Sequence, residues 1–253
     1  IVLLHGTSAS LHTWDGWAAA LRGQRRVIRL DLPGFGLTGP HSGPYAGQPY
    51  TATTDARVVL DALDALKLQR FVVAGNSLGG EVAWRIAQMA PQRVDRLVLV
   101  DSAGHDFNTD NVPLAWRMAG LPLVGGLIEH LLPRPLVVSG LVDVYGDPTR
   151  ITDALVDRYY ELTLRSGNRR ALVERIRQMK LGDGQAQIST LKLPTLIVWG
   201  GRDKLIPPDH ATRFQREIAG SQLAMFPALG HVPHEEDPAA TVVPVKAFLG
   251  LAP

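Results

Sequence analysis

The sequence predicts an α/β fold with a mostly parallel sheet and helices on both of its faces. Short runs rich in Val, Ile and Leu alternate with segments of helical periodicity. Most of these runs are nearly continuous, which is typical of parallel strands buried on both faces. The chain has 253 residues, of which 45% are hydrophobic and 20% are charged, so it can form a sizeable core.

The strands and helices of the core follow from this alternation. We expect strands at residues 1–5, 26–31, 70–74, 96–101, 195–200 and 221–227. We expect helices at residues 14–22, 53–66, 78–90, 208–218 and 238–249. The last helix has Asp237 as its predicted N-cap and Pro238 at its first position. An alternation of this kind indicates an open parallel sheet.

The alternation stops between residues 105 and 190, where no strand is expected. Helical patterns near residues 153–165 and 168–180 indicate a helical insertion between two strands. We therefore predict a core domain of residues 1–104 and 191–253 and a helical lid or cap of residues 105–190. The first half of the insertion is apolar, and its side chains either bury against the core or cover a pocket. They are Leu121, Leu123, Val124, Leu127, Ile128, Leu131 and Leu132.

The composition narrows the function classes. The chain has 26 Lys and Arg against 24 Asp and Glu, with a net charge of +2 and no block of like charge, so no nucleic-acid partner is expected. No apolar run is long enough for an integral membrane segment. The absence of cysteine excludes disulfides and thiolate metal sites. The chain opens inside an apolar strand without Met, so a preceding segment, including a targeting segment, is expected to be missing. Localisation and oligomeric state stay open.

The motif that carries chemistry is Gly75-Asn76-Ser77-Leu78-Gly79, which fits G-x-S-x-G between a predicted buried strand and a predicted helix. A serine on such a turn is strained and projects its hydroxyl above the sheet. The positions two before and two after it have no room for large side chains, and glycines stand at both. The following helix directs its N-terminal amides at the serine, which favours anionic charge there.

A serine needs a neighbouring base, and the base needs a carboxylate to orient it. Asp203 in WGGRDKLIP follows a predicted strand, as do His231 and His234 in LGHVPHEEDP. All three therefore fall at the sheet edge to which Ser77 projects. Asp101, also at a strand end, is a rival acid. A zinc pair is disfavoured, because H-x-x-H lacks the i, i+4 spacing of a helical pair and a proline interrupts it.

Over essentially the whole chain these motifs resemble the α/β-hydrolase superfamily, in its lidded serine esterase and lipase-like branch. His5-Gly6-Thr7 is similar to the oxyanion-loop motif, and residues 31–36 are similar to its D-x-P-G-x-G turn. The family pattern G-H-x-P-x-x-E falls on residues 230–236. The resemblance implies Ser77 as nucleophile, His231 as base and Asp203 as acid, with an oxyanion hole made by the backbone N–H groups of Thr7 and Leu78.

Three departures from the family pattern refine the prediction. The family normally has two further strands before the one at residues 1–5, which suggests truncation. The oxyanion motif is HGT rather than HGGG, which disfavours the branch with the glycine-rich loop. The nucleophile is Ser rather than Asp, which argues against epoxide hydrolases and haloalkane dehalogenases.

The resemblance implies hydrolysis of a small-molecule carboxylic ester with an apolar acyl or alcohol group, through an acyl-enzyme and without a metal or an organic cofactor. The residues predicted to line its substrate pocket are Gly6, Asn76, His105, Trp116 and Val232. His5 is expected to hold its loop and Glu236 to buttress the histidine loop. His234 and Glu235 are expected at the polar surface or the pocket rim.

Three alternatives stay open. A polar residue beside the serine, here Asn76, also occurs in hydrolases that cleave carbon–carbon bonds of ring-cleavage products. In that branch a Trp commonly follows the catalytic histidine, whereas Val232 stands here. A cofactor-free perhydrolase or haloperoxidase, or a non-enzymatic ligand receptor, is also compatible with this fold.

Overall fold

The computed structural model describes residues 1–107, 112, 114–119, 121, 126 and 129–252. Six strands form one sheet in the order β2-β1-β3-β4-β5-β6, and every neighbouring pair is parallel. The predicted α/β fold is confirmed, and every predicted strand is present with ends that differ by at most two residues. The strands are β1 (Val2–Leu4), β2 (Ile28–Leu30), β3 (Phe71–Asn76), β4 (Val94–Val100), β5 (Thr195–Gly200) and β6 (Gln222–Phe226).

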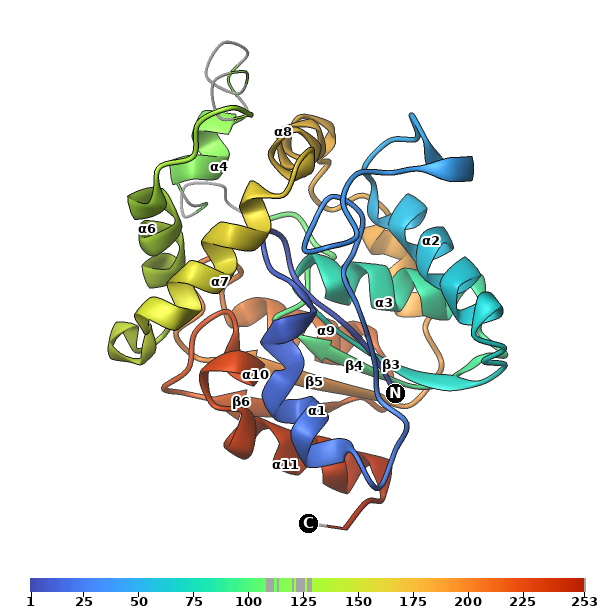
Figure 1. Cartoon of the computed structure of the whole chain (residues 1–253). Coiled ribbons are helices and arrows are strands. Elements are labelled where there is room, and N and C mark those ends of the chain that lie inside the picture. Colours follow the sequence, from blue (N-terminus) through green and yellow to red (C-terminus); the bar gives the residue numbers. More distant parts are fainter. Residues whose placement is uncertain (108–111, 113, 120, 122–125, 127–128, 253) are drawn as a thin grey trace.

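Helices cover both faces of the sheet (Figure 1). One face packs against α2 (Ala52–Ala65), α3 (Leu78–Met89) and α9 (Asp209–Glu217). The other packs against α1 (Asp15–Leu21) and α11 (Pro238–Leu249). The N-terminus of α11 forms as predicted, because the Asp237 side chain accepts a hydrogen bond from the Ala240 amide.

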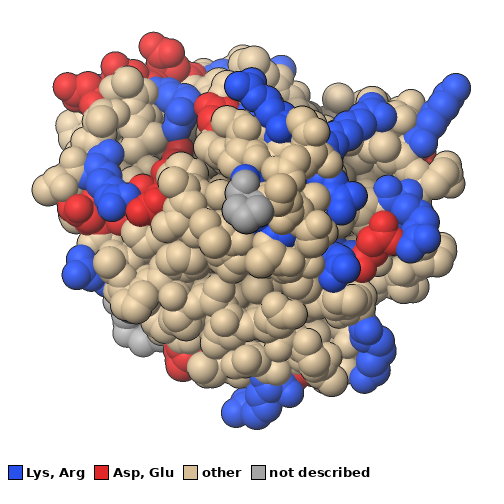
Figure 2. Space-filling model, turned by 90° about the horizontal axis from the view of Figure 1, so that it is seen from below, with Lys and Arg blue, Asp and Glu red and all other residues tan. Residues whose placement is uncertain are grey.

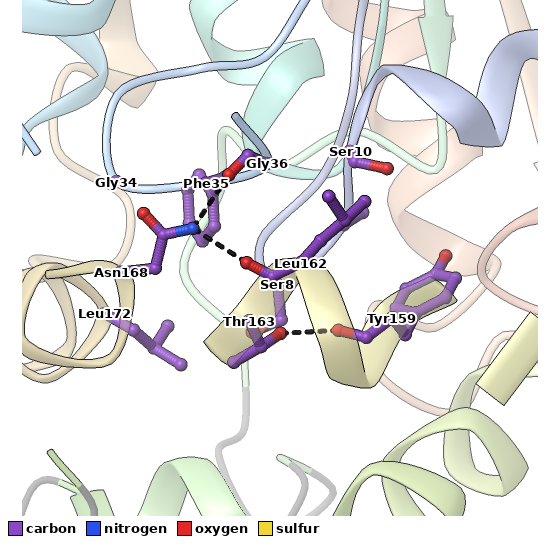
Figure 3. A pocket seen from close by; sticks show the side chains of 11 residues that line it. Ser8, Ser10, Gly34, Phe35, Gly36, Tyr159, Leu162, Thr163, Asn168 and Leu172 are labelled. Atoms are coloured by element: carbon purple, nitrogen blue, oxygen red, sulfur yellow. Dashed lines mark hydrogen bonds between the residues drawn. The ribbon is translucent and has the colours of Figure 1, made fainter. Parts of the chain in front are cut away.

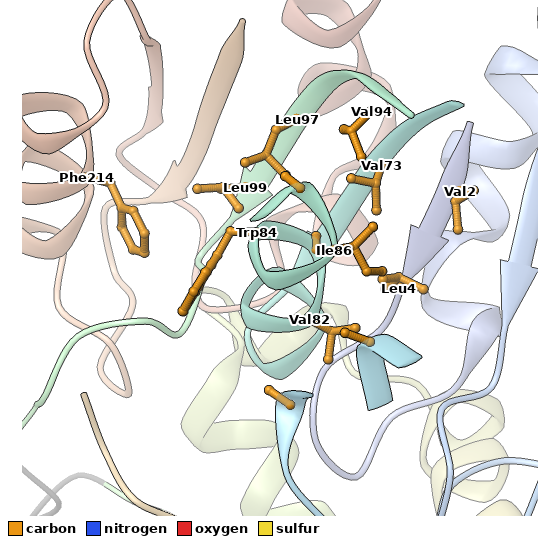
Figure 4. Close-up of a cluster of buried hydrophobic side chains, with 14 of the residues drawn as sticks. Val2, Leu4, Val73, Val82, Trp84, Ile86, Val94, Leu97, Leu99 and Phe214 are labelled. Carbon is orange, nitrogen blue, oxygen red and sulfur yellow. The ribbon is translucent and has the colours of Figure 1, made fainter. Parts of the chain in front are cut away.

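The larger core cluster lies between α3 and the strands β1, β3 and β4, as Figure 4 shows. Val73, Leu97 and Leu99 of the strands are fully buried there. Trp84 and Ile86 of α3 are fully buried as well. Each such side chain contributes about 1.5–3 kcal/mol on leaving water, so this cluster fixes α3, and with it the turn before α3, against the sheet.

The insertion contains α4 (Leu114–Ala119), α6 (Arg134–Val144), α7 (Asp153–Leu164) and α8 (Asn168–Gln178). These helices gather at the end of the molecule away from α11 (Figure 1), and no strand occurs among the described residues of 105–190. Of the two alternatives for the apolar half, burial against the core does not apply to Leu121 and Leu131, which are 53% and 58% exposed. The expectations for Leu123, Val124, Leu127 and Ile128 fall outside the described residues.

The surface carries both signs of charge. Figure 2 shows basic and acidic side chains scattered around a broad uncharged area, without a continuous basic stripe on that face. Within the described residues, no helix combines the length and apolarity needed to cross a bilayer.

Candidate active site

Ser77 lies on the turn between β3 and α3 in a conformation that few non-glycine residues adopt. Its φ is 53° and its ψ is −119°, and strain of this kind costs about 1–3 kcal/mol. The glycines make the turn possible: a Cβ at Gly75 would overlap the carbonyl oxygen of Gly79, and one at Gly79 would overlap that of Leu4. The sharp turn predicted from G-x-S-x-G is therefore present.

His231 lies in the loop after β6, beside Asp203 in the loop after β5. The His231 Nδ1 is 2.7 Å from the Asp203 Oδ2. The Asp203 Oδ1 accepts hydrogen bonds from the amides of Leu205 and Ile206 at 2.8 and 2.9 Å, so the carboxylate is firmly oriented. Since Nδ1 donates its proton to Asp203, Nε2 is the free acceptor. It is buried without a hydrogen-bond partner among the described residues, which suits a base.

Hydrogen bonds from the Asn76 side chain and from the His231 amide hold the histidine loop in place. The Asn76 Nδ2 donates to the carbonyl oxygen of His231 at 2.9 Å and to that of Val100 at 3.2 Å. The His231 amide donates to the carbonyl oxygen of Val144 at 2.7 Å. The side chain of Asn76 therefore joins the strand that bears Ser77 to the loop that bears His231.

Glu236 of α10 (Pro233–Glu236) also holds this loop. Its Oε2 accepts from the amides of Gly230 at 2.8 Å and Gly146 at 3.0 Å, and its Oε1 accepts from the amide of Asp147 at 2.8 Å. Glu236 thus buttresses the histidine loop, as expected from the sequence, and ties it to the insertion.

The expectation that His234 and Glu235 lie at the polar surface or the pocket rim is wrong for His234, whereas Glu235 is half-buried. His234 is fully buried, and its ring centroid is 4.0 Å from that of Trp14. Burial, followed by the charge of His231, lowers the pKa of His234 to about 3. The carboxylate of Glu235 accepts from Arg158 at 2.5 Å and from the hydroxyl of Tyr159 at 2.7 Å. Of the two histidines, only His231 has a carboxylate partner and a place beside the Ser77 turn.

The loop after β1 supplies the second candidate oxyanion donor. Thr7 and Leu78 line the same cavity as Ser77, and their amides have no acceptor among the described residues. His5 holds this loop as expected, since its Nε2 accepts from the Leu32 amide at 3.0 Å and its Nδ1 donates to the Gly6 carbonyl at 2.7 Å. A Cβ at Gly6 would lie 3.1 Å from the Ser77 Cβ, so glycine permits this close approach.

A cavity of about 230 Å³ opens at Ser77, between the sheet and the insertion. Of the predicted pocket residues, His105 and Trp116 line it. The prediction is wrong for Gly6, Asn76 and Val232, which do not line the cavity: the Asn76 side chain is hydrogen-bonded to the histidine loop, and Val232 packs in a cluster with Tyr145. The other apolar residues of the wall include Leu78, Phe107, Ile176, Met179, Leu181, Leu205 and Ile206.

The charged residues on the cavity wall were not predicted from the sequence. Arg85 donates from Nη2 to Glu81 at 2.7 Å and to the carbonyl of Asp183 at 2.7 Å. Burial raises the pKa of Glu81 above its usual value, against the opposing effect of Arg85. Arg175 of α8 donates to Asp55 at 2.7 Å. The i, i+4 spacing of the first pair was available in the sequence, whereas the second joins residues 120 positions apart.

A second, much smaller cavity lies between the loop at Ser8 and the helices α7 and α8 (Figure 3). Its volume is about 10 Å³, close to one water-sized sphere, so it is too small for an organic substrate. The Nδ2 of Asn168 donates to the carbonyls of Gly36 and Leu162, which holds α8 against the turn at residues 34–36. This cavity is a packing feature at the base of the insertion.

The comparisons with known proteins identify the family of this chain. The family profile described as alpha/beta hydrolase fold matches residues 1–238. This chain belongs to the α/β-hydrolase family. It is 29% identical to the 2-hydroxy-6-oxo-2,4-heptadienoate hydrolase of Pseudomonas putida, over 91% of this chain and 82% of that protein.

Two solved structures are also similar to this α/β hydrolase. The meta-cleavage product hydrolase of Pseudomonas fluorescens is 25% identical with a TM-score of 0.82, over 98% of this chain and 89% of that one. An esterase from Thermogutta terrifontis is 22% identical with a TM-score of 0.81, over 98% of this chain and 88% of that one. At 22% identity, the similarity to the esterase shows a shared fold and nothing about activity.

Proposed function

We propose that this α/β hydrolase is a serine-dependent carboxylic-ester hydrolase. The observation that carries the proposal is the buried hydrogen bond between His231 Nδ1 and Asp203 at 2.7 Å. It leaves Nε2 free beside the strained turn of Ser77. A geometry of this kind supports a nucleophile activated by a base that a carboxylate orients.

In the proposed reaction Ser77 Oγ attacks the ester carbonyl while His231 Nε2 takes its proton. The N–H groups of Thr7 and Leu78 stabilise the oxyanion of the tetrahedral intermediate, at about 3–4 kcal/mol per donor. Collapse of the intermediate breaks the ester bond, and His231 gives its proton to the leaving alcohol. Water, deprotonated by His231, then attacks the acyl-enzyme and releases the carboxylic acid and Ser77.

The charges on the cavity wall favour an uncharged, apolar substrate. Arg85 and Arg175 are already bonded to carboxylates, and Lys180, at the cavity, has an exposed side chain. Among the described residues of the wall, no buried cation is left to receive a substrate carboxylate. The apolar side chains instead gain about 0.8 kcal/mol for each CH₂ group that they bury.

The experiment is an ester panel of p-nitrophenyl esters with increasing acyl length. We expect kcat/KM to rise about fourfold with each added CH₂ until the cavity is full, which is the rate equivalent of 0.8 kcal/mol. Ser77→Ala should remain folded and lose turnover. The matched control is Ser102→Ala, which removes a nearby buried serine hydroxyl bonded to Ala103 and should keep the activity. Turnover by Ser77→Ala would refute serine catalysis.

The second candidate is a carbon–carbon hydrolase, which the similarity to the heptadienoate hydrolase favours. The panel therefore includes a 2-hydroxy-6-oxo-dienoate. Efficient cleavage of that compound with negligible ester turnover would replace the ester proposal by this one. Tight binding without turnover of any member would instead indicate a receptor.

A further inference from the structure

Asp101 is a buried carboxyl group that the proposed reaction does not use. It follows β4, is fully buried, and has a φ of 42° in the left-handed region. Its Oδ1 accepts a hydrogen bond from the Gly200 amide at 2.9 Å. Its Oδ2 is buried without a hydrogen-bond partner among the described residues. Backbone strain and a buried oxygen without a hydrogen-bond partner both cost free energy, so a role for the Asp101 side chain is expected.

The neighbour of this carboxyl group is the Asp203–His231 pair. Asp101, Asp203 and His231 each offer a polar atom, and these atoms all lie within 4.8 Å of one another in a fully buried cluster. Two carboxylates this close in a protein interior repel each other strongly when both are charged, so one of them holds a proton. The hydrogen bonds that each carboxyl group receives decide which of the two holds the proton.

Asp203 is the carboxylate whose negative charge receives more hydrogen bonds. It receives three N–H groups, from the amides of Leu205 and Ile206 and from the His231 ring. Asp101 receives one, from Gly200. Hydrogen bonds to an anion favour the ionised form, so the proton belongs on Asp101. Burial, then the charge of Asp203, raises the pKa of Asp101 well above its usual value.

We propose that Asp101 carries a proton at neutral pH and donates it from Oδ2, as a hydrogen bond, to the carboxylate of Asp203. Asp101 is then a positioning residue that acts through Asp203. It gives the buried Oδ2 a partner, fixes the Asp203 carboxylate against His231, and keeps the site at one negative charge. This inference rests on the proposed roles of Ser77, His231 and Asp203.

Within the part of the chain that the structure describes, the other groups that face Asp101 supply neither an alternative proton acceptor nor a cation. His231 donates to Asp203. Glu236 acts on Asp101 only through its charge, which raises the Asp101 pKa further, and its oxygens accept the three amides of residues 146, 147 and 230.

The test compares Asp101→Asn with Asp101→Ala. Asparagine keeps the acceptor for Gly200 and offers a permanent N–H donor to Asp203, so it imitates the protonated acid. We expect the kinetic pKa of kcat/KM on a p-nitrophenyl ester to equal that of the wild type. Alanine removes the donor, and kcat should fall about tenfold relative to Asp101→Asn, as for one lost hydrogen bond to a charged group.

If Asp101 were ionised instead, Asp101→Asn would remove a negative charge close to His231. The kinetic pKa would then fall by about one unit or more, and that shift would overturn the proposal. Equal kcat for the Asn and Ala variants would overturn it too. Where Asp101→Ala fails to fold, the pH profile of Asp101→Asn decides alone.

An infrared difference spectrum separates this inference from the proposed function. At neutral pH, wild type minus Asp101→Asn should show the carbonyl band of a protonated carboxylic acid, whether or not the protein hydrolyses esters. The half-buried acids Glu81 and Glu235, whose pKa values are also raised, are present in both proteins, so their bands cancel. Absence of the band refutes the proton on Asp101, whereas the band in a protein without hydrolase activity refutes only the proposed reaction.

Discussion

Acidification from about pH 7.5 to about pH 5 should destabilise the wild-type protein more than a His234→Phe variant, by about 2 kcal/mol. His234 is fully buried and packs on Trp14. Neither ring nitrogen has a hydrogen-bond partner among the described residues. Phenylalanine keeps an aromatic ring of similar size against Trp14 and Trp17 and removes the group that titrates.

The magnitude follows from the pKa of His234, which burial lowers from 6.5 to about 3. The folded protein binds the proton less readily than the unfolded chain. The stability contribution is therefore complete above the unfolded pKa and is lost as the pH falls from 6.5 towards the folded pKa. Each pH unit in that window costs about 1.4 kcal/mol. Because pH 5 lies about 1.5 pH units below 6.5, the free energy of unfolding should fall by about 2 kcal/mol.

The assay is urea unfolding of both proteins at a series of pH values. Other groups contribute to the pH dependence of both, so the difference between the two curves isolates His234. At pH values above 7 that difference should be constant, and it should grow steadily below 6.5. Parallel curves over the whole range would show that His234 is not buried as a neutral ring.

Two further changes test the turn and the insertion. Gly79→Ala would place a Cβ against the carbonyl oxygen of Leu4, so the free energy of unfolding should fall by about 1–3 kcal/mol; a Tm equal to that of the wild type would contradict the close approach. Arg175→Met would leave Asp55 as a buried charge without its arginine, which should cost about 3–5 kcal/mol. Adding Asp55→Leu should restore most of that loss in thermal unfolding, and no recovery would argue against the ion pair.

Local rules accounted for much of the fold. The six strands and the Ser77 turn were predictable because continuous apolar runs and closely spaced glycines act over a few residues. Asp203 and His231 meet because each follows a strand, and β5 and β6 are neighbours in the sheet.

The order of the strands was not predictable from those rules, and it changes the meaning of Asp101. Because β4 lies next to β5, Asp101 and Asp203 stand side by side rather than as alternatives. The predicted position of His234 was wrong for a similar reason. Three acidic residues follow it in the sequence, but its burial depends on Trp14 and Trp17, more than 200 positions away in the chain.

The hydrogen bonds of Glu236 have a consequence for how residues 105–190 can be exchanged by design. Residues 144–147, in the middle of the insertion, are held by Glu236 and by the His231 amide. Exchanging the whole insertion for that of another hydrolase would remove the hydrogen bonds that tie the histidine loop to residues 144–147, while the bond from Asn76 to the His231 carbonyl would stay. A chimaera that exchanges residues 105–143 and 148–190 but keeps residues 144–147 retains these hydrogen bonds, and its two new segments must still pack on each other as α6 packs on α7 and α4 on α8.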